Sequence, residues 1–213
     1  VNWLPLYHDM GLIACYWLPL LLNIPIIAMS PFDWVKKPRM LFESITKYNG
    51  TLCWLPNFSY HHLIRSIPES KKEGLNLSSI RGLTNCSEPV LKDTHDLFFK
   101  HFSDCGIKKE SLWTCYALAE ATFAVTVGGP LAPPYSERID KNAFTLSGQA
   151  IQNPNGKGML SSGKALPGCH VKILRPSGKE CADREIGEIL IQSPSVVSGY
   201  WNSENGTKSF CNL

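Results

Sequence analysis

The sequence lacks the features that mark a disulfide-rich, zinc-binding or nucleic-acid-binding protein. Its eight cysteines form no C-x-x-C pair and stand mostly within apolar runs. We therefore interpret them as reduced, buried thiols of a cytoplasmic protein rather than as a disulfide framework or a zinc site. The chain has 21 basic and 18 acidic residues and a net charge of +3. Because the lysine pairs are scattered, we expect neither a nucleic-acid partner nor a membrane-binding patch.

Charged residues are also missing from positions 10–32, a run long enough to suggest a membrane span. Pro19, Asn23 and Pro25 divide this run and argue against a spanning helix. The pattern instead predicts a buried helix over residues 11–22 and a buried strand over residues 24–29. We therefore expect no transmembrane segment.

Short apolar runs alternate with helix-length amphipathic stretches through the first part of the chain. Further strands are predicted at residues 51–55, 82–86 and 112–116, with helices at 37–48 and 89–105. This alternation predicts an α/β fold, with a mostly parallel sheet and flanking helices over residues 1–127.

The composition changes after Thr126. Residues 128–158 are rich in Gly, Pro, Asn and Ser, and we interpret 128–160 as an insertion or linker. Two β-like runs follow at 170–174 and 186–192, around a turn at 175–178, and predict a hairpin. Residues 161–213 are therefore predicted to begin a smaller, β-rich unit.

Two residues in the middle of the chain have the chemistry of a nucleotide site. Tyr116 closes a predicted buried strand, and parallel sheets bind ligands beyond the carboxyl ends of their strands, where an aromatic ring can stack on a base. Glu120 lies in an apolar stretch without a nearby basic residue, so its carboxylate needs a cation such as Mg²⁺. Taken singly, a core aromatic and a helix-start acid that accepts from backbone amides are the better interpretations.

Two further segments carry polar groups near predicted turns. His8 stands between apolar residues at a strand-to-helix transition, where it could orient a substrate carboxylate or serve a structural role. Residues 84–89, TNCSEP, could line a base, or Asn85 and Ser87 could cap the helix that follows.

The three segments together carry a family resemblance. Residues 3–11 (WLPLYHDMG), 84–89 (TNCSEP) and 116–122 (YALAEAT) occur in the order and spacing of the fatty acyl-AMP ligases, a branch of the adenylate-forming (ANL) enzymes related to acyl-CoA synthetases. Residues 56–58 (PNF), 162–168 (SGKALPG) and 199–201 (GYW) also fit, so the resemblance covers nearly the whole chain. It implies the α/β part of an AMP-binding domain, followed by the start of a distorted barrel.

The resemblance assigns roles to these residues. Tyr116, followed by Ala117, would stack on the adenine of ATP, and the loop of Asn85, Cys86 and Ser87 would cover its other face. Glu120 would hold Mg²⁺ at the phosphates. His8 would lie beside the acyl carboxylate, and the helix from residue 11 to 17 would help to wall an acyl tunnel.

The sequence departs from the family at three places. Ala117 stands where a glycine is usual, Cys86 and Ser87 replace a smaller pair, and Trp54-Leu55 replaces the small residues before residues 56–58. The first two changes concern nucleotide binding. The resemblance implies that Trp54 would narrow or reshape the acyl tunnel.

The resemblance also implies a reaction. A fatty or related carboxylic acid would attack ATP to give an acyl-adenylate, and the acyl group would pass to the phosphopantetheine of a carrier protein, because the long interval between Glu120 and Gly163 is similar to an insertion that hinders the use of CoA. Alternatives are an acyl-CoA synthetase, an amino-acid adenylation domain, or a scaffold that has kept the fold and lost the chemistry.

The family pattern predicts that the sequence is an internal piece of an N-terminal domain. The chain begins with Val1 rather than Met. The family's phosphate loop would precede Val1, its ribose-binding Asp would follow Leu213, and its catalytic Lys would lie in a further domain. The piece alone is then expected to be inactive and, through its unpaired sheet edges, to self-associate.

Overall fold

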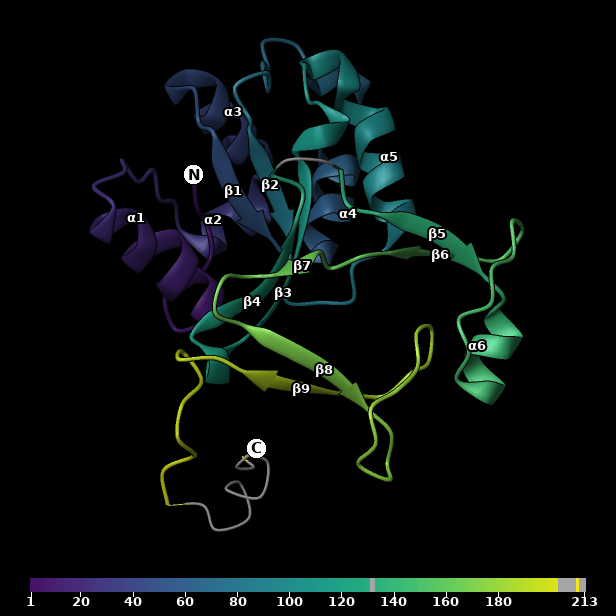
Figure 1. Cartoon of the computed structure of the whole chain (residues 1–213). Coiled ribbons are helices and arrows are strands. Elements are labelled where there is room, and N and C mark those ends of the chain that lie inside the picture. Colours follow the sequence, from purple (N-terminus) through teal and green to yellow (C-terminus); the bar gives the residue numbers. More distant parts are fainter. Residues whose placement is uncertain (131–132, 203–209, 211–213) are drawn as a thin grey trace.

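A central five-stranded sheet organises the chain. The computed structural model describes residues 1–130, 133–202 and 210. The strand order is β1-β2-β3-β4-β7, in which β1, β2 and β3 are parallel and β4 and β7 are antiparallel to their neighbours (Figure 1). The predicted α/β class is confirmed. The strands are β1 (Leu52–Leu55), β2 (Gly82–Asn85), β3 (Leu112–Leu118), β4 (Phe123–Gly128) and β7 (Lys164–Ala165).

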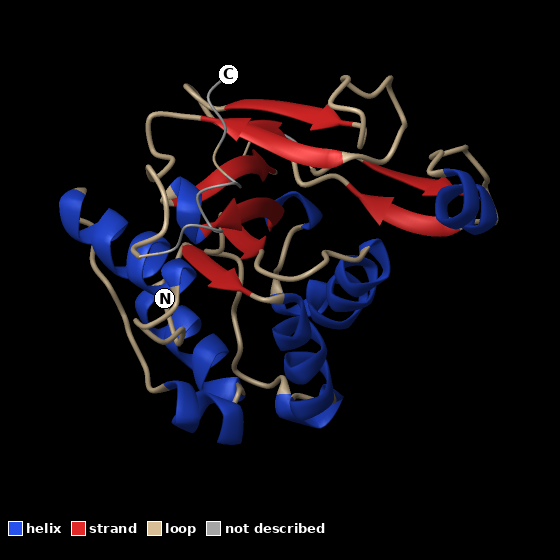
Figure 2. Ribbon diagram, turned by 90° about the horizontal axis from the view of Figure 1, so that it is seen from below, coloured by secondary structure: helices blue, strands red, loops and turns tan. Residues whose placement is uncertain are grey.

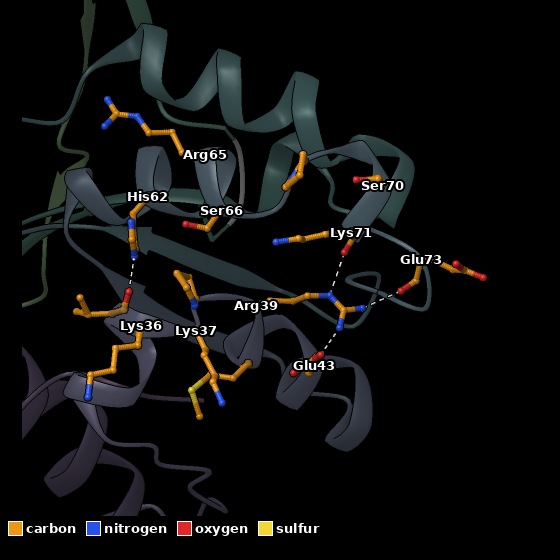
Figure 3. A pocket seen from close by; sticks show the side chains of 14 residues that line it. Lys36, Lys37, Arg39, Glu43, His62, Arg65, Ser66, Ser70, Lys71 and Glu73 are labelled. Atoms are coloured by element: carbon orange, nitrogen blue, oxygen red, sulfur yellow. Dashed lines mark hydrogen bonds and ion pairs between the residues drawn. The ribbon is translucent and has the colours of Figure 1, made fainter.

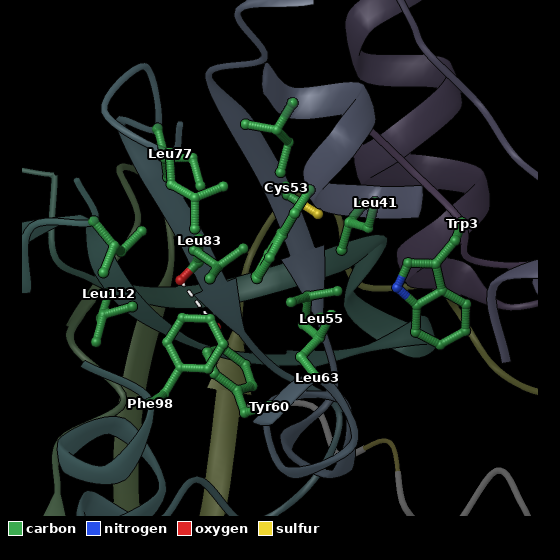
Figure 4. Packing of buried hydrophobic residues seen from close by; sticks show 14 of the residues in the cluster. Trp3, Leu41, Cys53, Leu55, Tyr60, Leu63, Leu77, Leu83, Phe98 and Leu112 are labelled. Atoms are coloured by element: carbon green, nitrogen blue, oxygen red, sulfur yellow. Dashed lines mark hydrogen bonds between the residues drawn. The ribbon is translucent and has the colours of Figure 1, made fainter. Parts of the chain in front are cut away.

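Three helices cover one face of this sheet: α3 (Arg39–Tyr48), α4 (Asn57–Ser66) and α5 (Lys92–Phe102), as Figure 2 shows from below. Their apolar sides form an aromatic core in which Phe42, Phe98 and Phe102 are fully buried and pack against one another. Tyr60 joins them and donates its hydroxyl to the carbonyl of Leu83, 3.1 Å away, which links α4 to β2 (Figure 4).

The opposite face carries a π-helix, η1 (Met10–Trp17), that continues into α1 (Leu18–Leu21). The predicted helix at 11–22 is therefore confirmed, and η1 packs on β1 and β4. The prediction that this whole helix is buried is wrong for its second half, where Trp17 and Leu21 are exposed. Within the described ranges, no helix is long and apolar enough to cross a membrane.

The prediction of a strand at residues 24–29 is wrong. This segment makes only an isolated bridge, between Ala28 and Asn2, and Ile24 is exposed. Pro25 lacks the N–H that a ladder requires. After this segment, α2 (Pro31–Lys36) places Trp34 flat against Trp3, with ring centroids 3.8 Å apart.

Two predicted helices begin later than expected. The helix predicted at 37–48 starts at Arg39, after Pro38, and ends at Asn49, whose φ of 51° gives the left-handed stop that Asn favours. The helix predicted at 89–105 starts at Lys92, because Leu91 is extended. Short 3-10 turns complete this part: η2 (Glu69–Lys71), η3 (Ser103–Cys105), η4 (Lys109–Ser111) and η5 (Ala119–Ala121).

The rest of the chain contains two small antiparallel sheets. The predicted hairpin is confirmed as β8 (His170–Leu174) with β9 (Glu188–Gln192), although the turn at 175–178 is followed by a further excursion before β9 begins. The segment predicted as an insertion or linker has structure of its own, which the sequence did not reveal: β5 (Ser136–Ile139), α6 (Lys141–Ser147) and β6 (Lys157–Leu160).

The boundaries at 127 and 160 stay a prediction. β7 follows the second boundary yet pairs with β4, so the two parts share a sheet. The insertion lies against α5, where Arg138 Nη2 is 3.9 Å from Asp93 Oδ1.

The cysteines in the described ranges are free thiols. Five of them are buried as predicted, whereas Cys169 and Cys181 are only half-buried. Burial raises the pKa of Cys53 to about 11. Over the same ranges, no group of three or more His, Cys, Asp or Glu side chains is placed to hold a metal ion.

Candidate active site

The three sequence segments meet at the carboxyl edge of the parallel strands. Asn85, the last residue of β2, pairs with Thr114 on β3, and β3 continues past the end of β2 to Leu118. The loop after Asn85 therefore runs beside the end of β3. The start of η1 reaches the same place, because Ser87 Oγ lies 3.6 Å from Met10 Sδ. Residues far apart in sequence thus form one candidate site.

His8 lies at the entrance to η1 and is held by its neighbour. Its Nδ1 is 2.7 Å from Asp9 Oδ1, and the amide of Met10 donates to Asp9 Oδ1 at 2.7 Å. The same amide lies 3.3 Å from His8 Nδ1, which accepts from it only while that nitrogen carries no proton. The His8 side chain is 48% exposed. With Nδ1 engaged, Nε2 is the nitrogen available to a substrate carboxylate.

Asn85 points its side chain away from the loop that it begins. It is fully buried against α4 and α5, where Nδ2 donates to Asn57 Oδ1 at 3.0 Å and lies 3.2 Å from His95 Nε2. Asn85 Oδ1 has no hydrogen-bond partner among the described residues. Only the backbone of Asn85 is therefore placed for the role that the resemblance implies, and its side chain anchors β2 to the helices.

Cys86 lies in the core, whereas the next residue, Ser87, lies at the surface. Cys86 is fully buried, so its side chain does not crowd the exposed side of the loop. A hydrogen bond with Cys115 lowers the pKa of the Cys86 thiol, against the effect of burial. Ser87 has a φ of 69°, a left-handed conformation that glycine adopts more easily, and it is exposed.

Glu88 anchors the same loop, a role that we did not predict. Its Oε2 accepts a 2.8 Å hydrogen bond from the amide of Phe58 in the first turn of α4. An acid at this position accepts from an amide that has no partner within the helix, and its negative charge interacts favourably with the positive end of the helix dipole. The signal was present in the sequence, since Glu88 belongs to the TNCSEP motif.

Tyr116 and Ala117 lie at an irregularity of β3. Tyr116 pairs with Thr126 and Ala117 with Ala124, so the register with β4 shifts between them. Such a shift re-aims the side chains that follow it. Both residues are half-buried, next to the loop of Cys86 and Ser87.

Glu120 lies in η5, at the tip of the β3–β4 hairpin. Its Oε1 accepts a short hydrogen bond from the hydroxyl of Tyr200, and its backbone carbonyl accepts from Val197 N at 2.8 Å. The bond from Tyr200 lowers the pKa of Glu120, so the carboxylate is ionised at neutral pH. Thr122 Oγ1 also donates to the Ser195 carbonyl, at 2.8 Å. The segment after β9 is thereby attached to the hairpin tip.

The carboxylate of Glu120 fits Mg²⁺ as a single ligand. It is ionised, partly exposed and has no cationic side chain paired with it in the described ranges. Mg²⁺ is often bound through one or two carboxylates together with substrate phosphates and water. Such a carboxylate can serve as one ligand of a metal that arrives with a nucleotide.

His95 makes stability depend on pH. Burial lowers its pKa from 6.5 to about 4, and Nε2 must be unprotonated to accept from Asn85. The unfolded chain therefore binds more protons between these values, and the free energy of unfolding falls as the pH drops from about 6.5 to about 4, by roughly 3 kcal/mol at most. Urea titrations across this range would measure the loss.

A His95→Gln variant is the matched control, since its amide oxygen accepts from Asn85 but does not titrate. We expect a flatter pH dependence in the same window. An unchanged slope would assign the acid sensitivity to other groups.

A wide hollow elsewhere on the surface has a different character. It measures about 960 Å³ and lies between α2, α3 and the end of α4 (Figure 3). Its lining includes Lys36, Lys37 and Lys71, while Arg39 is tied to Glu43 and to the carbonyls of the 71–73 turn. None of the residues predicted for the active site lines it.

Comparison with known proteins now identifies the family. The chain matches the AMP-binding enzyme family over residues 1–201. It belongs to this family.

Similar proteins confirm the resemblance to fatty acyl-AMP ligases. The medium-chain-fatty-acid acyl-carrier-protein ligases JamA of Moorena producens and TtuA of Teredinibacter turnerae are 31% and 32% identical, over 97% and 98% of this chain and 36% and 33% of their own. The chain thus spans about a third of these relatives.

Solved structures agree with this assignment. The fatty acyl-adenylate ligase from Legionella pneumophila, in complex with acyl adenylate and pyrophosphate, superposes with a TM-score of 0.91 at 38% identity, covering 97% of this chain and 37% of that one. The adenylation domain of a keto acid-selecting NRPS module, at 19% identity and a TM-score of 0.88, shares the fold.

Proposed function

We propose that the full-length protein uses ATP to convert a fatty acid into an acyl-adenylate. The observation that carries this proposal is the contact of Ser87 with the start of η1, at the end of β2, beside the strand β3 that bears Tyr116 and leads to Glu120. The similar relatives of this chain are named as fatty-acid ligases. JamA and TtuA are named as ligases of medium-chain fatty acids and carrier proteins, which favours a medium-chain fatty acid here.

The reaction would be a substitution at phosphorus. A carboxylate oxygen of the acid attacks the α-phosphorus of ATP, an O–P bond forms, the bond to the β-phosphate oxygen breaks, and pyrophosphate leaves with its electrons. His8 Nε2 would orient the attacking carboxylate, and the loop of Cys86 and Ser87 with Tyr116 would hold adenine. Glu120 would bind the magnesium that neutralises phosphate charge. Catalysis then rests on positioning and charge neutralisation.

The test is ATP–pyrophosphate exchange by the full-length protein with a series of fatty acids. We expect exchange that depends on the acid. Its complete absence, together with no heat of binding for a nonhydrolysable acyl-adenylate analogue, would favour the scaffold alternative. Exchange with amino acids in place of fatty acids would favour the amino-acid adenylation alternative.

Tyr116→Ala tests the adenine site. Stacking of an aromatic ring on a base contributes about 1–3 kcal/mol, so we expect the KM for ATP to rise about tenfold or more. Tyr116→Phe retains the ring and should keep the KM of the unchanged protein. Equal KM values for all three proteins would remove Tyr116 from the nucleotide site.

The insertion supports a carrier protein as the acyl acceptor. Residues 136–160 form a folded unit that rests on α5, with Arg138 beside Asp93 and Gly158 close to Lys92. An anchored insertion supports restricted domain movement, and hence transfer to a carrier protein rather than to CoA. We would supply both a carrier protein and CoA in one reaction and analyse the products by mass spectrometry. We expect the acyl group on the carrier protein. Acyl-CoA as the main product would identify a CoA synthetase.

Residues 1–213 alone are expected to show no exchange, since the resemblance places the phosphate loop and the catalytic Lys outside them. We also expect self-association of this piece. β1 is a terminal strand of the sheet, and α1 exposes Leu20 and Leu21. Light scattering would detect it, and a monomer at high concentration would contradict it.

A further inference from the structure

A mostly apolar cavity of about 350 Å³ lies on the sheet face that carries η1 and α1. Ala14, Cys15 and Leu18 line it from the helices, and Trp54 and Trp113 line it from the strands. It is separate from the basic hollow on the other side of the sheet, and no residue assigned to the nucleotide lines it.

Trp54, Thr84 and Trp113 stand side by side on the floor of the cavity. The strand register pairs Trp54 with Thr84 and Thr84 with Trp113. Trp113 is fixed, because its Nε1 donates to the Glu110 carbonyl at 3.0 Å and its ring covers Gly82, where a Cβ would come within 2.5 Å. Trp54 is the member of this row nearest the edge of the sheet.

Trp54 also contacts the hairpin that carries Glu120. The ring centroids of Trp54 and Phe123 are 5.1 Å apart, at an interplanar angle of 72°. Phe123 belongs to β4, which is three strands from β1, a separation of roughly 14 Å in a flat sheet. The end of the β3–β4 hairpin must therefore curl over this face. Trp54 consequently has the hairpin on one side and the cavity on the other.

The helix η1 connects the candidate active site to this place. It starts at Met10, beside Ser87, and its next turns present Ala14 and Cys15 to the cavity. An apolar chain whose carboxylate lies at His8 and which follows η1 along the sheet meets Trp54 before it reaches the cavity.

We propose that Trp54, backed by Phe123, sets the longest acyl chain that the enzyme accepts, and that the cavity behind it is room which the unchanged protein does not use. This inference rests on the proposed acyl-adenylate chemistry. Shortening Trp54 would join the cavity to the acyl site. Each additional methylene of the acyl chain that enters an apolar pocket raises kcat/KM about tenfold or more.

The experiment compares full-length Trp54→Ala with the unchanged protein, using saturated fatty acids of increasing length in the exchange assay. We expect the ratio of kcat/KM for long over short acids to rise by about tenfold or more. Calorimetry with acyl-adenylate analogues of the same lengths should show the same shift in affinity. Trp54→Leu, which removes less volume, serves if the alanine variant does not fold. Trp201→Ala is the matched control, because Trp201 is 98% exposed.

Leu18→Trp tests the cavity itself. Leu18 is 48% exposed at the rim, where a larger ring has room to enter. Added to Trp54→Ala it should cancel the gain for long acids, and alone it should leave the length profile unchanged. A shortened profile in the single Leu18→Trp variant would mean that the cavity already holds the chain, and would overturn the proposal.

The failures are distinguishable. An unchanged length profile in Trp54→Ala or Trp54→Leu, with exchange intact, overturns the role of Trp54 alone. Absence of exchange by the unchanged protein with every acid overturns the proposed function instead.

Discussion

Full-length Glu120→Ala is expected to lose ATP–pyrophosphate exchange by about a hundred- to a thousandfold, the usual effect of removing one group that stabilises charge in a transition state. The hydrogen bond from the Tyr200 hydroxyl lowers the pKa of Glu120 further below neutral pH, and no basic side chain is paired with the carboxylate in the described ranges. Its charge is therefore available to the magnesium of MgATP. The loss should appear mainly in kcat, and a higher magnesium concentration should be needed for half of the maximal rate.

Two variants accompany Glu120→Ala. Tyr200→Phe keeps the carboxylate and removes only its hydrogen bond, so it should reduce exchange much less. Glu180→Ala removes an exposed acid of the β8–β9 part and should change nothing. Full exchange activity in Glu120→Ala would dismiss the assignment of Glu120 to magnesium, and the hairpin tip would then be structural.

Phe98→Ala should lower the free energy of unfolding by about 3–5 kcal/mol, the range for truncating a fully buried phenylalanine. Phe98 is inaccessible to solvent and lies against Phe42, Tyr60 and Phe102. These aromatic side chains come from three helices, so the cavity would be closed only by moving a helix. Urea titration of the intact protein, followed by far-UV circular dichroism, would measure the change.

Leu97→Ala is the control on the same helix. Leu97 is 51% exposed, and its truncation should stay within about 0.5 kcal/mol. Leu97 and Phe98 are apolar neighbours in the sequence of α5, and only the structure shows that one is exposed and the other buried. Equal losses for the two variants would contradict the packing described above.

The regular elements of the first part could be predicted from local patterns. β1, β2 and β3 are short apolar runs, and α3 ends at an Asn in the left-handed conformation that this residue tolerates. β4 was missed because its turn carries no Gly or Asn signal: Thr122 and Phe123 both have positive φ, which such residues rarely adopt. Tertiary contacts from Ser195 and Val197 support this turn, and they are invisible in a local window.

The sequence by itself determined the family and the chemical kind of each site residue, because motif order and residue type are properties of the chain. The tertiary structure decided how those residues are used. It turned the Asn85 side chain into the core, joined Glu120 to Tyr200, and brought Trp54 against Phe123. Strand pairing and the curl of the β3–β4 hairpin set these contacts, and both arise from packing between segments that no local pattern relates.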